Sequence, residues 1–265
     1  MAVVGAILGT PEVLAGKSCE ETTMNADKAS EAFDAGLRLR NTLNTGGQKV
    51  LILARRGQNL EKYGVTFSHA AFAVRAADGR GWSVFHDLNI CGSDSAKLFE
   101  QGLADFLADD LYSSEVAMVV PEDWLQDRLL QILSSGPERF LMHETHYSAV
   151  AYPFSIKYQN SNGWLLETYA RAAADVKLNG RSDAQAWLKT NQYVPSILNL
   201  GPLTRLGGRV FKANVAFDDH PDALRWNNRI TVNTGDDVLR FVSKNAIPQP
   251  QCSHGQFSQA VCISK

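Results

Sequence analysis

Two histidines, His69 and His86, lie in a segment whose pattern predicts a β-hairpin. With Asp78-Gly79 as a two-residue turn, Ala71 pairs with His86. Side chains alternate between the two faces of a strand, so His69 and Ala71 share the face of His86. Two imidazoles within reach of each other can act as a general base and the group that orients it. The spacing therefore predicts a histidine pair on one face.

The two faces of this hairpin differ in the size of their side chains. Ala71 and Ala73 leave the histidine face uncrowded, whereas Phe72, Val74 and Phe85 fill the opposite face. We therefore expect one face to pack into a core and the other to admit another element. The competing interpretation is an ordinary strand pair whose histidines are simply hydrogen-bonded.

A serine at a predicted helix start is the candidate nucleophile. Polar residues that favour helix starts precede Ser161, and an amphipathic pattern follows it. His69 could take the hydroxyl proton while His86 orients the ring. Backbone N–H groups at the helix start, with Asn160 or Gln159, could stabilise an oxyanion. Two alternatives remain open: Ser161 is only a helix cap beside an abandoned site, or a serine that has replaced a cysteine.

The composition describes a globular chain with enough apolar residues for a full core. The 265 residues are 45% hydrophobic, so we expect the chain to fold without a cofactor. The 26 basic and 28 acidic residues give a charge of −2, and lysine and arginine do not cluster with aromatics, which excludes a nucleic-acid partner. No apolar run approaches the ~20 residues that span a bilayer, so we expect no integral membrane segment.

The first residues have features of an export signal. Met1–Leu8 is apolar and Leu14-Ala15-Gly16 offers a small-residue cleavage zone, but a basic leader is missing. Residues 1–18 are therefore either the remnant of a signal or a short ordered strand. Two residues separate the small residues from Cys19, so lipid attachment to that cysteine is not expected.

None of the four cysteines stands in a zinc-binding Cys-x-x-Cys motif, so structural zinc is not expected. In an exported protein, Cys252 with Cys262 would close the polar tail, and Cys19 with Cys91 would tie the N-terminus to the loop after the hairpin. Three pairings are possible in all, and the sequence does not choose between them. In a cytosolic protein all four would be free thiols.

Apolar periodicity predicts helices and strands that together form an α+β fold. On the apolar sides of the first three predicted helices, we expect Phe33 and Leu37, Phe99, and Trp124, respectively, to face the core. The predicted helices cover 26–43, 95–111, 121–133, a segment that begins at Ser161 and extends to Val176, 182–190 and 235–244, and the predicted strands beyond the hairpin cover 49–54, 115–120, 209–217 and 228–232.

This order of elements resembles the circularly permuted papain-like superfamily of NlpC-type hydrolases and acyltransferases. Ser68-His69-Ala70-Ala71-Phe72 matches its histidine strand, His86 matches its second polar residue, and Asn160-Ser161 stands where Asn-Cys is expected. A thiol with a pKa near ~8.5 is readily ionised by an imidazole, whereas a serine hydroxyl is far more basic. The serine in this chain would therefore need a better aligned base.

More closely, the chain resembles the bacterial family catalogued as domain of unknown function 2145. This resemblance covers most of residues 19–245 and rests on two segments, Tyr158-Gln-Asn-Ser-Asn-Gly-Trp164 and Asn214-Val-Ala-Phe-Asp-Asp-His-Pro221. It implies an exported protein, periplasmic or secreted, but no established activity. It implies a papain-like antiparallel sheet packed against helices in 19–177, a C-terminal α/β elaboration of the same domain in 178–248, and a polar tail in 249–265.

Three functions are compatible with the candidate residues and the family resemblance. The first is an exported hydrolase or acyltransferase that acts on an amide or ester bond, for example in cell-wall peptide or lipid. The second is an inactive papain-like module that holds a peptide, glycan or lipid, and the third is a periplasmic assembly partner that uses the C-terminal elaboration. The sequence does not specify the substrate or the oligomeric state.

Several other residues are weaker candidates for a functional site. His143-Glu-Thr-His146 and Asp218-Asp219-His220-Pro221 contain ligand-type residues, but neither has the spacing of a zinc protease, and no metal is expected. The remaining candidates are Asp87 and Asn89 as alternatives to His86, Cys91 near the hairpin exit, and Tyr147, Tyr152 and Tyr158 as residues that line a cleft or pack.

Overall fold

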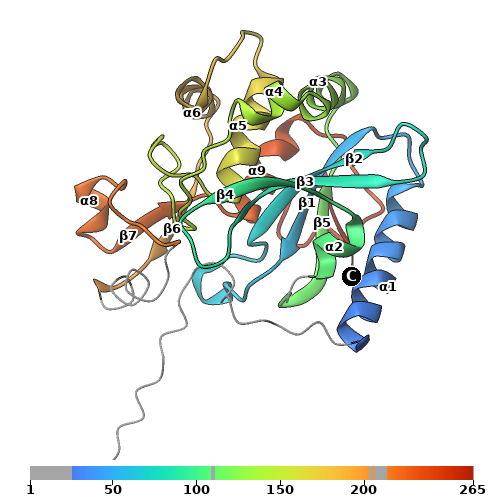
Figure 1. The fold of residues 1–265 in the computed structure, drawn as a ribbon, viewed down its shortest axis with the longest axis horizontal. Helices are drawn as coiled ribbons and strands as arrows, with labels where there is room; N and C mark the ends of the chain where they lie inside the picture. Colours follow the sequence, from blue (N-terminus) through green and yellow to red (C-terminus); the bar gives the residue numbers. More distant parts are fainter. Residues whose placement is uncertain (1–25, 109–110, 203–204, 206–213, 265) are drawn as a thin grey trace, which may run out of the picture.

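The computed structural model describes residues 26–108, 111–202, 205 and 214–264. A six-stranded sheet with the order β4-β3-β2-β1-β5-β8 forms its centre, and every neighbouring pair in it is antiparallel (Figure 1). The strands are β1 (Val50–Arg56), β2 (His69–Arg75), β3 (Trp82–Asn89), β4 (Ala96–Gln101), β5 (Ser113–Val119) and β8 (Val261–Ser264).

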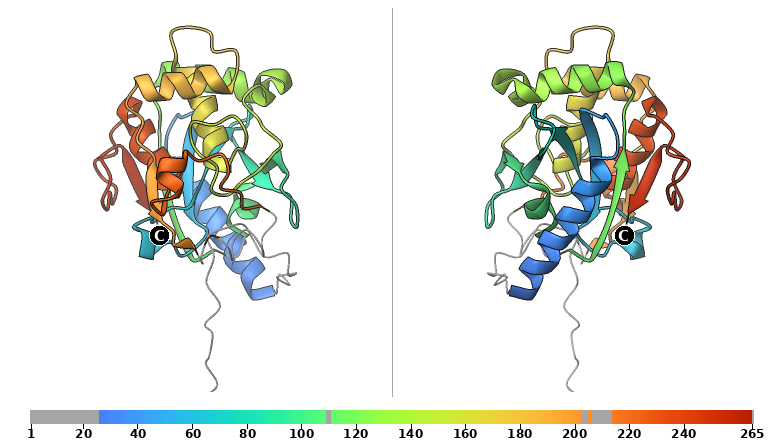
Figure 2. Two further views of the ribbon diagram at one scale, coloured as in Figure 1. Left: turned by 90° about the vertical axis from the view of Figure 1, so that its left-hand side faces the viewer. Right: turned by 90° about the vertical axis from the view of Figure 1, so that its right-hand side faces the viewer.

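Helices cover both faces of this sheet, because the strand side chains alternate between two apolar clusters. Ile52 and Phe72 face a cluster that includes α3, α5 and α9, whereas Leu51 and Leu53 face α1 and α2. Figures 1 and 2 show α1 on the opposite side of the sheet from α3 and α5. The helices are α1 (Ala26–Leu43), α2 (Leu103–Ala108), α3 (Asp123–Ser134), α4 (Gly136–Phe140), α5 (Ser161–Ala173), α6 (Arg181–Thr190), α8 (Asp222–Arg225) and α9 (Gly235–Val242), with short 3-10 turns at Glu61–Tyr63 and Ser243–Asn245.

The protein is therefore a mixed α+β fold in which an antiparallel sheet packs against helices, as the sequence predicts. None of the described helices combines the length and the apolar character that crossing a bilayer requires.

A second, two-stranded sheet lies beside the main one. Its strands, β6 (Ser196–Asn199) and β7 (Arg229–Val232), pair antiparallel and share a small apolar cluster with Leu60 and Val150. The sequence predicts β7 but not β6. The predicted strand at 209–217 falls largely outside the described residues, and the described part of it, 214–217, is not a strand.

The end of the polar tail belongs to the main sheet. β8 pairs with β5, and a disulfide between Cys252 and Cys262 closes the loop that precedes the strand. The Cys252–Cys262 pairing offered by the sequence is thus present. The proposed Cys19–Cys91 pairing involves a residue outside the described part of the chain.

The predicted helix at 95–111 is wrong. Residues 96–101 instead form β4, which pairs with β3, and Gly102 separates it from the short helix α2. The backbone groups at the edge of β3 pair with this segment, and that pairing outweighs the helical spacing of its apolar residues. Phe99 is consequently exposed rather than part of a helical core stripe.

The core-facing side of α1 also differs from the prediction. Phe33 is 68% exposed and Leu37 is 46% exposed, whereas Ala32 and Leu39 are buried. The reason is Gly36, where an added Cβ would lie 2.9 Å from the backbone of Ala104. The small-residue face of α1 permits this close approach to α2, and Phe33 and Leu37 therefore face outward.

Two further apolar side chains lie outside the core. Trp124 is partly exposed, and its indole N–H donates to Glu122 Oε2 at 2.7 Å. Val176 follows the last residue of α5 and is exposed, because the helix ends at Ala173.

Candidate active site

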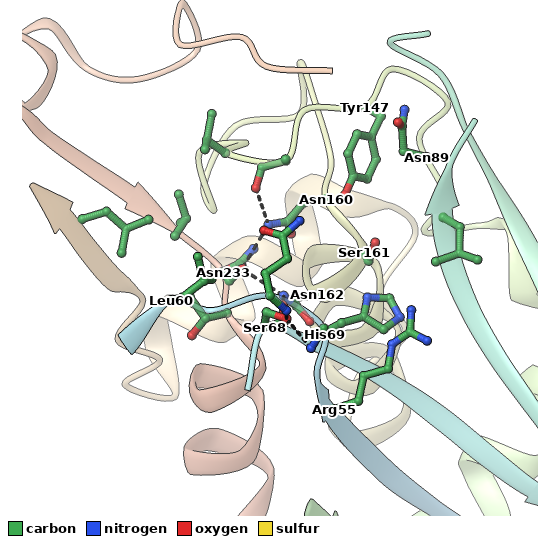
Figure 3. A pocket seen from close by; sticks show the side chains of 18 of the residues that line it. Arg55, Leu60, Ser68, His69, Asn89, Tyr147, Asn160, Ser161, Asn162 and Asn233 are labelled. Carbon is green, nitrogen blue, oxygen red and sulfur yellow. Dashed lines mark hydrogen bonds between the residues drawn. The ribbon is translucent and has the colours of Figure 1, made fainter. Parts of the chain in front are cut away.

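A cavity of about 350 Å³ lies where α5 begins, between the main sheet and the small β6–β7 sheet (Figure 3). It brings together His69 from β2 and Ser161 from α5, two residues that lie more than ninety positions apart in the sequence. The other described lining residues are Arg55, Gly57, Gln58, Leu60, Ser68, Leu88, Asn89, Cys91, Leu111, Tyr147, Ala149, Val150, Asn160, Asn162, Leu198, Val232, Asn233 and Thr234.

The hairpin that carries the histidines has the predicted register. Phe72 pairs with Phe85, and His69 Nε2 lies 2.9 Å from His86 Nδ1, which is a hydrogen bond between the two rings. The connection is wider than the predicted two-residue turn, because Ala76 N–H donates to Gly81 O. This change leaves the pairing unaltered, so the two histidines share one face.

A third residue, Gln101 on β4, completes this chain of side chains. Gln101 Oε1 lies 2.8 Å from His86 Nε2, and because an amide oxygen only accepts, His86 Nε2 carries the proton. His86 Nδ1 is then the acceptor for His69 Nε2–H. This tautomer leaves the lone pair of His69 Nδ1 available, which is what a general base requires. The sequence did not reveal Gln101, because its segment has the apolar spacing of a helix.

The surroundings of His69 favour its neutral form. Burial, then the positive charge of Arg55, then His86 hold the pKa of His69 well below its ordinary value of 6.5. The Phe106 ring packs against both imidazoles, with centroids 6.2 Å from His69 and 5.7 Å from His86. Phe106 thus fills the face that the small residues Ala71 and Ala73 leave open.

Ser161 is the first residue of α5, and the residue that caps the helix is Asn160. Asn160 Oδ1 accepts from Gly163 N–H at 2.8 Å, whereas its amide nitrogen donates to Asn233 O and Ala149 O. The cap of this helix is therefore Asn160 and not Ser161. The amide of Asn160 is also fully engaged with the protein, so the candidate oxyanion donors at this helix start are backbone N–H groups.

Asn162 fastens the start of α5 to the strand that carries His69. Its Oδ1 accepts from Ala70 N–H at 2.9 Å, and its Nδ2 donates to Ser68 O at 3.0 Å. These two bonds flank His69 on both sides. The residue after the serine thus fixes the backbone of the histidine, a function that no local pattern in the sequence indicates.

Tyr147 is a polar neighbour of Ser161 in the cavity. Burial raises the pKa of Tyr147 to about 12, while hydrogen bonding with the side chain and backbone of Ser161 acts in the opposite direction. Within the described residues, Ser161 makes no hydrogen bond to His69. In Figure 3 the Ser161 side chain lies between the Tyr147 ring and His69. Proton transfer to His69 therefore requires the Ser161 hydroxyl to turn toward the imidazole.

Gln159, the other predicted oxyanion donor, faces away from the cavity. Its amide nitrogen donates to Glu167 Oε2 at 2.6 Å and to Met142 O at 2.8 Å, and its Oε1 accepts from Glu144 N–H. It anchors the segment that leads to Ser161.

The alternatives to His86 have other contacts. Asp87 lies on the opposite face of β3 and is 3.3 Å from His143 Nε2, without the geometry of a hydrogen bond. Burial raises the pKa of Asp87, and contact with His143 opposes that shift. Asn89 lines the cavity but is held by Ser93, Ser95 and Asn214.

The remaining histidine candidates form separate local contacts. His146 Nδ1 lies 3.0 Å from Glu144, and the buried His220 lies 2.9 Å from both Asp219 and Thr231 O. Among the described residues, no group of three or more ligand-type side chains could hold a metal ion. Tyr147 and Cys91 line the cavity, whereas Tyr152 and Tyr158 lie outside it.

Comparison with known proteins gives one match. A family described as "Uncharacterized protein conserved in bacteria (DUF2145)" matches residues 42–242. That range contains every element that lines the cavity. No curated protein and no solved structure matches the chain.

Proposed function

The chain belongs to the bacterial family DUF2145, and we propose that it is a serine-dependent hydrolase or acyltransferase that acts on an amide or ester bond. The observation that carries the proposal is the chain Gln101–His86–His69, which ends in an available Nδ1 on the wall of the cavity that also contains Ser161. A nucleophile, a base and an orienting group are the parts that acyl transfer needs.

In the proposed reaction, Ser161 Oγ attacks the carbonyl carbon and its proton passes to His69 Nδ1. The hydroxyl of Tyr147 and the backbone N–H groups at the start of α5 stabilise the negative charge on the carbonyl oxygen. The imidazolium returns the proton to the leaving amine or alcohol, which leaves an ester on Ser161. Water or an acceptor alcohol or amine then attacks the ester and gives its proton to His69, which passes that proton to Ser161 Oγ as the acyl group leaves.

A papain-like ancestry and an exported location form part of the same proposal. The histidine strand, its polar partner and the helix that begins at the nucleophile occur in the order expected of permuted NlpC-type proteins. The Cys252–Cys262 disulfide supports a periplasmic or secreted location, because such bonds persist in oxidising compartments.

A second function, binding without cleavage, is favoured by one feature of the site. His86 is oriented by the neutral Gln101 rather than by a carboxylate, and Arg55 opposes a positive charge on His69. Both features weaken His69 as a base. Persistent binding of a ligand that is recovered intact after long incubation would support this function over the first.

The test of the proposed enzyme is the Ser161→Cys variant. At mildly acidic pH an ordinary thiol, with a pKa of about 8.5, is almost entirely protonated and reacts slowly with iodoacetamide. We expect the new cysteine to be alkylated there, and the additional substitution His69→Gln to slow that reaction. If the single variant does not react, or if both variants react equally, His69 does not activate residue 161.

A further inference from the structure

The polar side chains that line the cavity are mostly bonded to the protein itself. Asn162 bonds to Ser68 O, Ala70 N–H and Asn233 O, and the Ser68 hydroxyl accepts from Gly57 N–H and Gln58 N–H. Asn160 and Asn89 are engaged in the same way, as described above. Thr234 belongs to the capping box of α9. A ligand therefore meets few free donors or acceptors away from Ser161.

The cavity also offers a ligand little charge. Its described lining contains one ionisable cation, Arg55, and no carboxylate. Arg55 is buried, donates to Phe106 O and lies over the Phe106 ring, 4.7 Å from its centroid. Its guanidinium is thus already bonded within the protein and packed on an aromatic ring at the cavity wall. A charged group moved into this cavity would lose its hydration without gaining an unengaged counter-ion from the described lining.

The wall opposite the histidines is apolar. Leu198 on β6 and Val232 on β7 come from the small sheet, and Leu60 and Val150 belong to the same cluster. Leu88 and Leu111 add to the lining. At about 350 Å³ the space is near the lower end of the usual range for small-molecule sites, about 300–1,000 Å³, which suits one group rather than a polymer segment.

From these observations we infer that the cavity binds an uncharged aliphatic acyl group, with its carbonyl at Ser161 and its chain against the β6–β7 wall. The inference rests on the proposed function, because it names the group that Ser161 would receive. It makes the C-terminal sheet the part of the protein that selects the substrate. It also disfavours the acidic and basic side chains of cell-wall peptides as occupants.

Binding to the Ser161→Ala variant tests this inference without requiring turnover. The probes are octanamide and two analogues of the same length, ω-amino-octanamide and the monoamide of octanedioic acid, titrated by calorimetry. We expect octanamide to bind at least about tenfold more tightly than either charged analogue, because the cavity cannot replace their hydration. Equal or tighter binding of a charged analogue, or no saturable binding of octanamide, would overturn the inference.

A matched pair of variants locates the binding surface. Leu198 lines the cavity, whereas its neighbour Ile197 is 43% exposed and does not line it. In the Ser161→Ala background, Leu198→Ala should weaken octanamide binding by about fivefold or more, and Ile197→Ala should leave it unchanged. Equal effects of the two substitutions would place the ligand elsewhere. Thermal melts check that both variants fold, and the comparison of probes stands without them.

The wild-type protein separates this inference from the proposed function. Cleavage of p-nitrophenyl octanoate in preference to p-nitrophenyl acetate, lost in Ser161→Ala, supports both. If octanamide binds selectively but neither ester is cleaved, the inference holds and the enzymatic proposal fails.

Discussion

Two consecutive turns of α5 differ sharply in how their polar groups are bonded. In the second turn, buried Glu167 accepts hydrogen bonds from Gln159 at 2.6 Å, Gln185 at 2.7 Å and Arg181 at 2.8 Å. In the first turn, Ser161 borders a cavity, and its hydroxyl has Tyr147 as its polar neighbour. The carboxylate of Glu167 is thus bonded within the protein, whereas the hydroxyl of Ser161 borders a cavity where a ligand can reach it.

The difference indicates how the helix supports a reactive end. Gln159, which Glu167 holds, lies two residues before Ser161, and Asn160 caps the helix between them. The backbone at the serine is thus fixed by neighbours on both sides. The hydroxyl itself need not contribute to stability, so its removal should affect chemistry and not folding. Substitutions along α5 therefore test whether its first turn serves chemistry and its second turn stability.

The largest expected effect is the loss of turnover on removing the reactive groups. Ser161→Ala and His69→Gln should each lower the rate of ester cleavage by about 10³-fold or more, because each removes a group required in the transition state. The melting temperature of Ser161→Ala should stay near that of the wild type. Kinetics with p-nitrophenyl esters and thermal melts give both values, and undiminished activity in either variant would refute its catalytic role.

The second-largest effect is expected in the turn of α5 that contains Glu167. Glu167→Ala should lower the free energy of unfolding by about 3–5 kcal/mol, because it removes the closest carboxylate from the largely buried Arg181 guanidinium. The control is Glu138→Ala, which removes an ion pair to Arg171 from a side chain that is 45% exposed and should cost at most about 1 kcal/mol. Urea denaturation measures both, and equal costs would show that the network is not the anchor of α5.

A smaller effect is expected at the cap between these turns. Asn160→Ala should cost about 1 kcal/mol of unfolding free energy, because Gly163 N–H loses its acceptor. Asn160→Ser should recover most of that stability, since serine also caps helices well. If serine fails to restore what alanine removes, the bonds from Asn160 to Asn233 and Ala149, rather than the cap, are what hold the turn.

The smallest effect is a dependence of stability on pH. The folded pKa of His69 lies well below the ordinary 6.5, so below that pH the unfolded chain takes up a proton that the folded protein does not. The contribution of His69 to stability is therefore complete above 6.5 and declines as the pH falls. Denaturation at a series of pH values should show a shallower decline in His69→Gln, and an unchanged slope would contradict this assignment.

The sequence predicts the histidine pair well because the pairing depends on parity alone. A turn at Asp78-Gly79 fixes which residues share a face, and the wider connection that is present preserves that register. The helix start at Ser161 was similarly readable, because capping residues and an amphipathic pattern are local signals.

The rest depends on contacts between distant segments. Gln101 was hidden because β4 gains its structure from the free edge of β3, against the helical spacing of its apolar residues. The orientation of α1 depends on the close approach of Gly36 to α2. The functions of Asn162 and Tyr147 follow only from the segments they touch, Ser68–Ala70 and the start of α5.

The most direct test of whether His69 activates Ser161 is labelling with a fluorophosphonate, followed by intact-protein and peptide mass spectrometry. Such a reagent bonds to a serine oxygen, with loss of fluoride, only when a base activates that serine. We predict a single adduct on Ser161, formed at least about tenfold more slowly in His69→Gln. The absence of an adduct on Ser161, or an equal rate in His69→Gln, would contradict the pairing of this serine with this histidine.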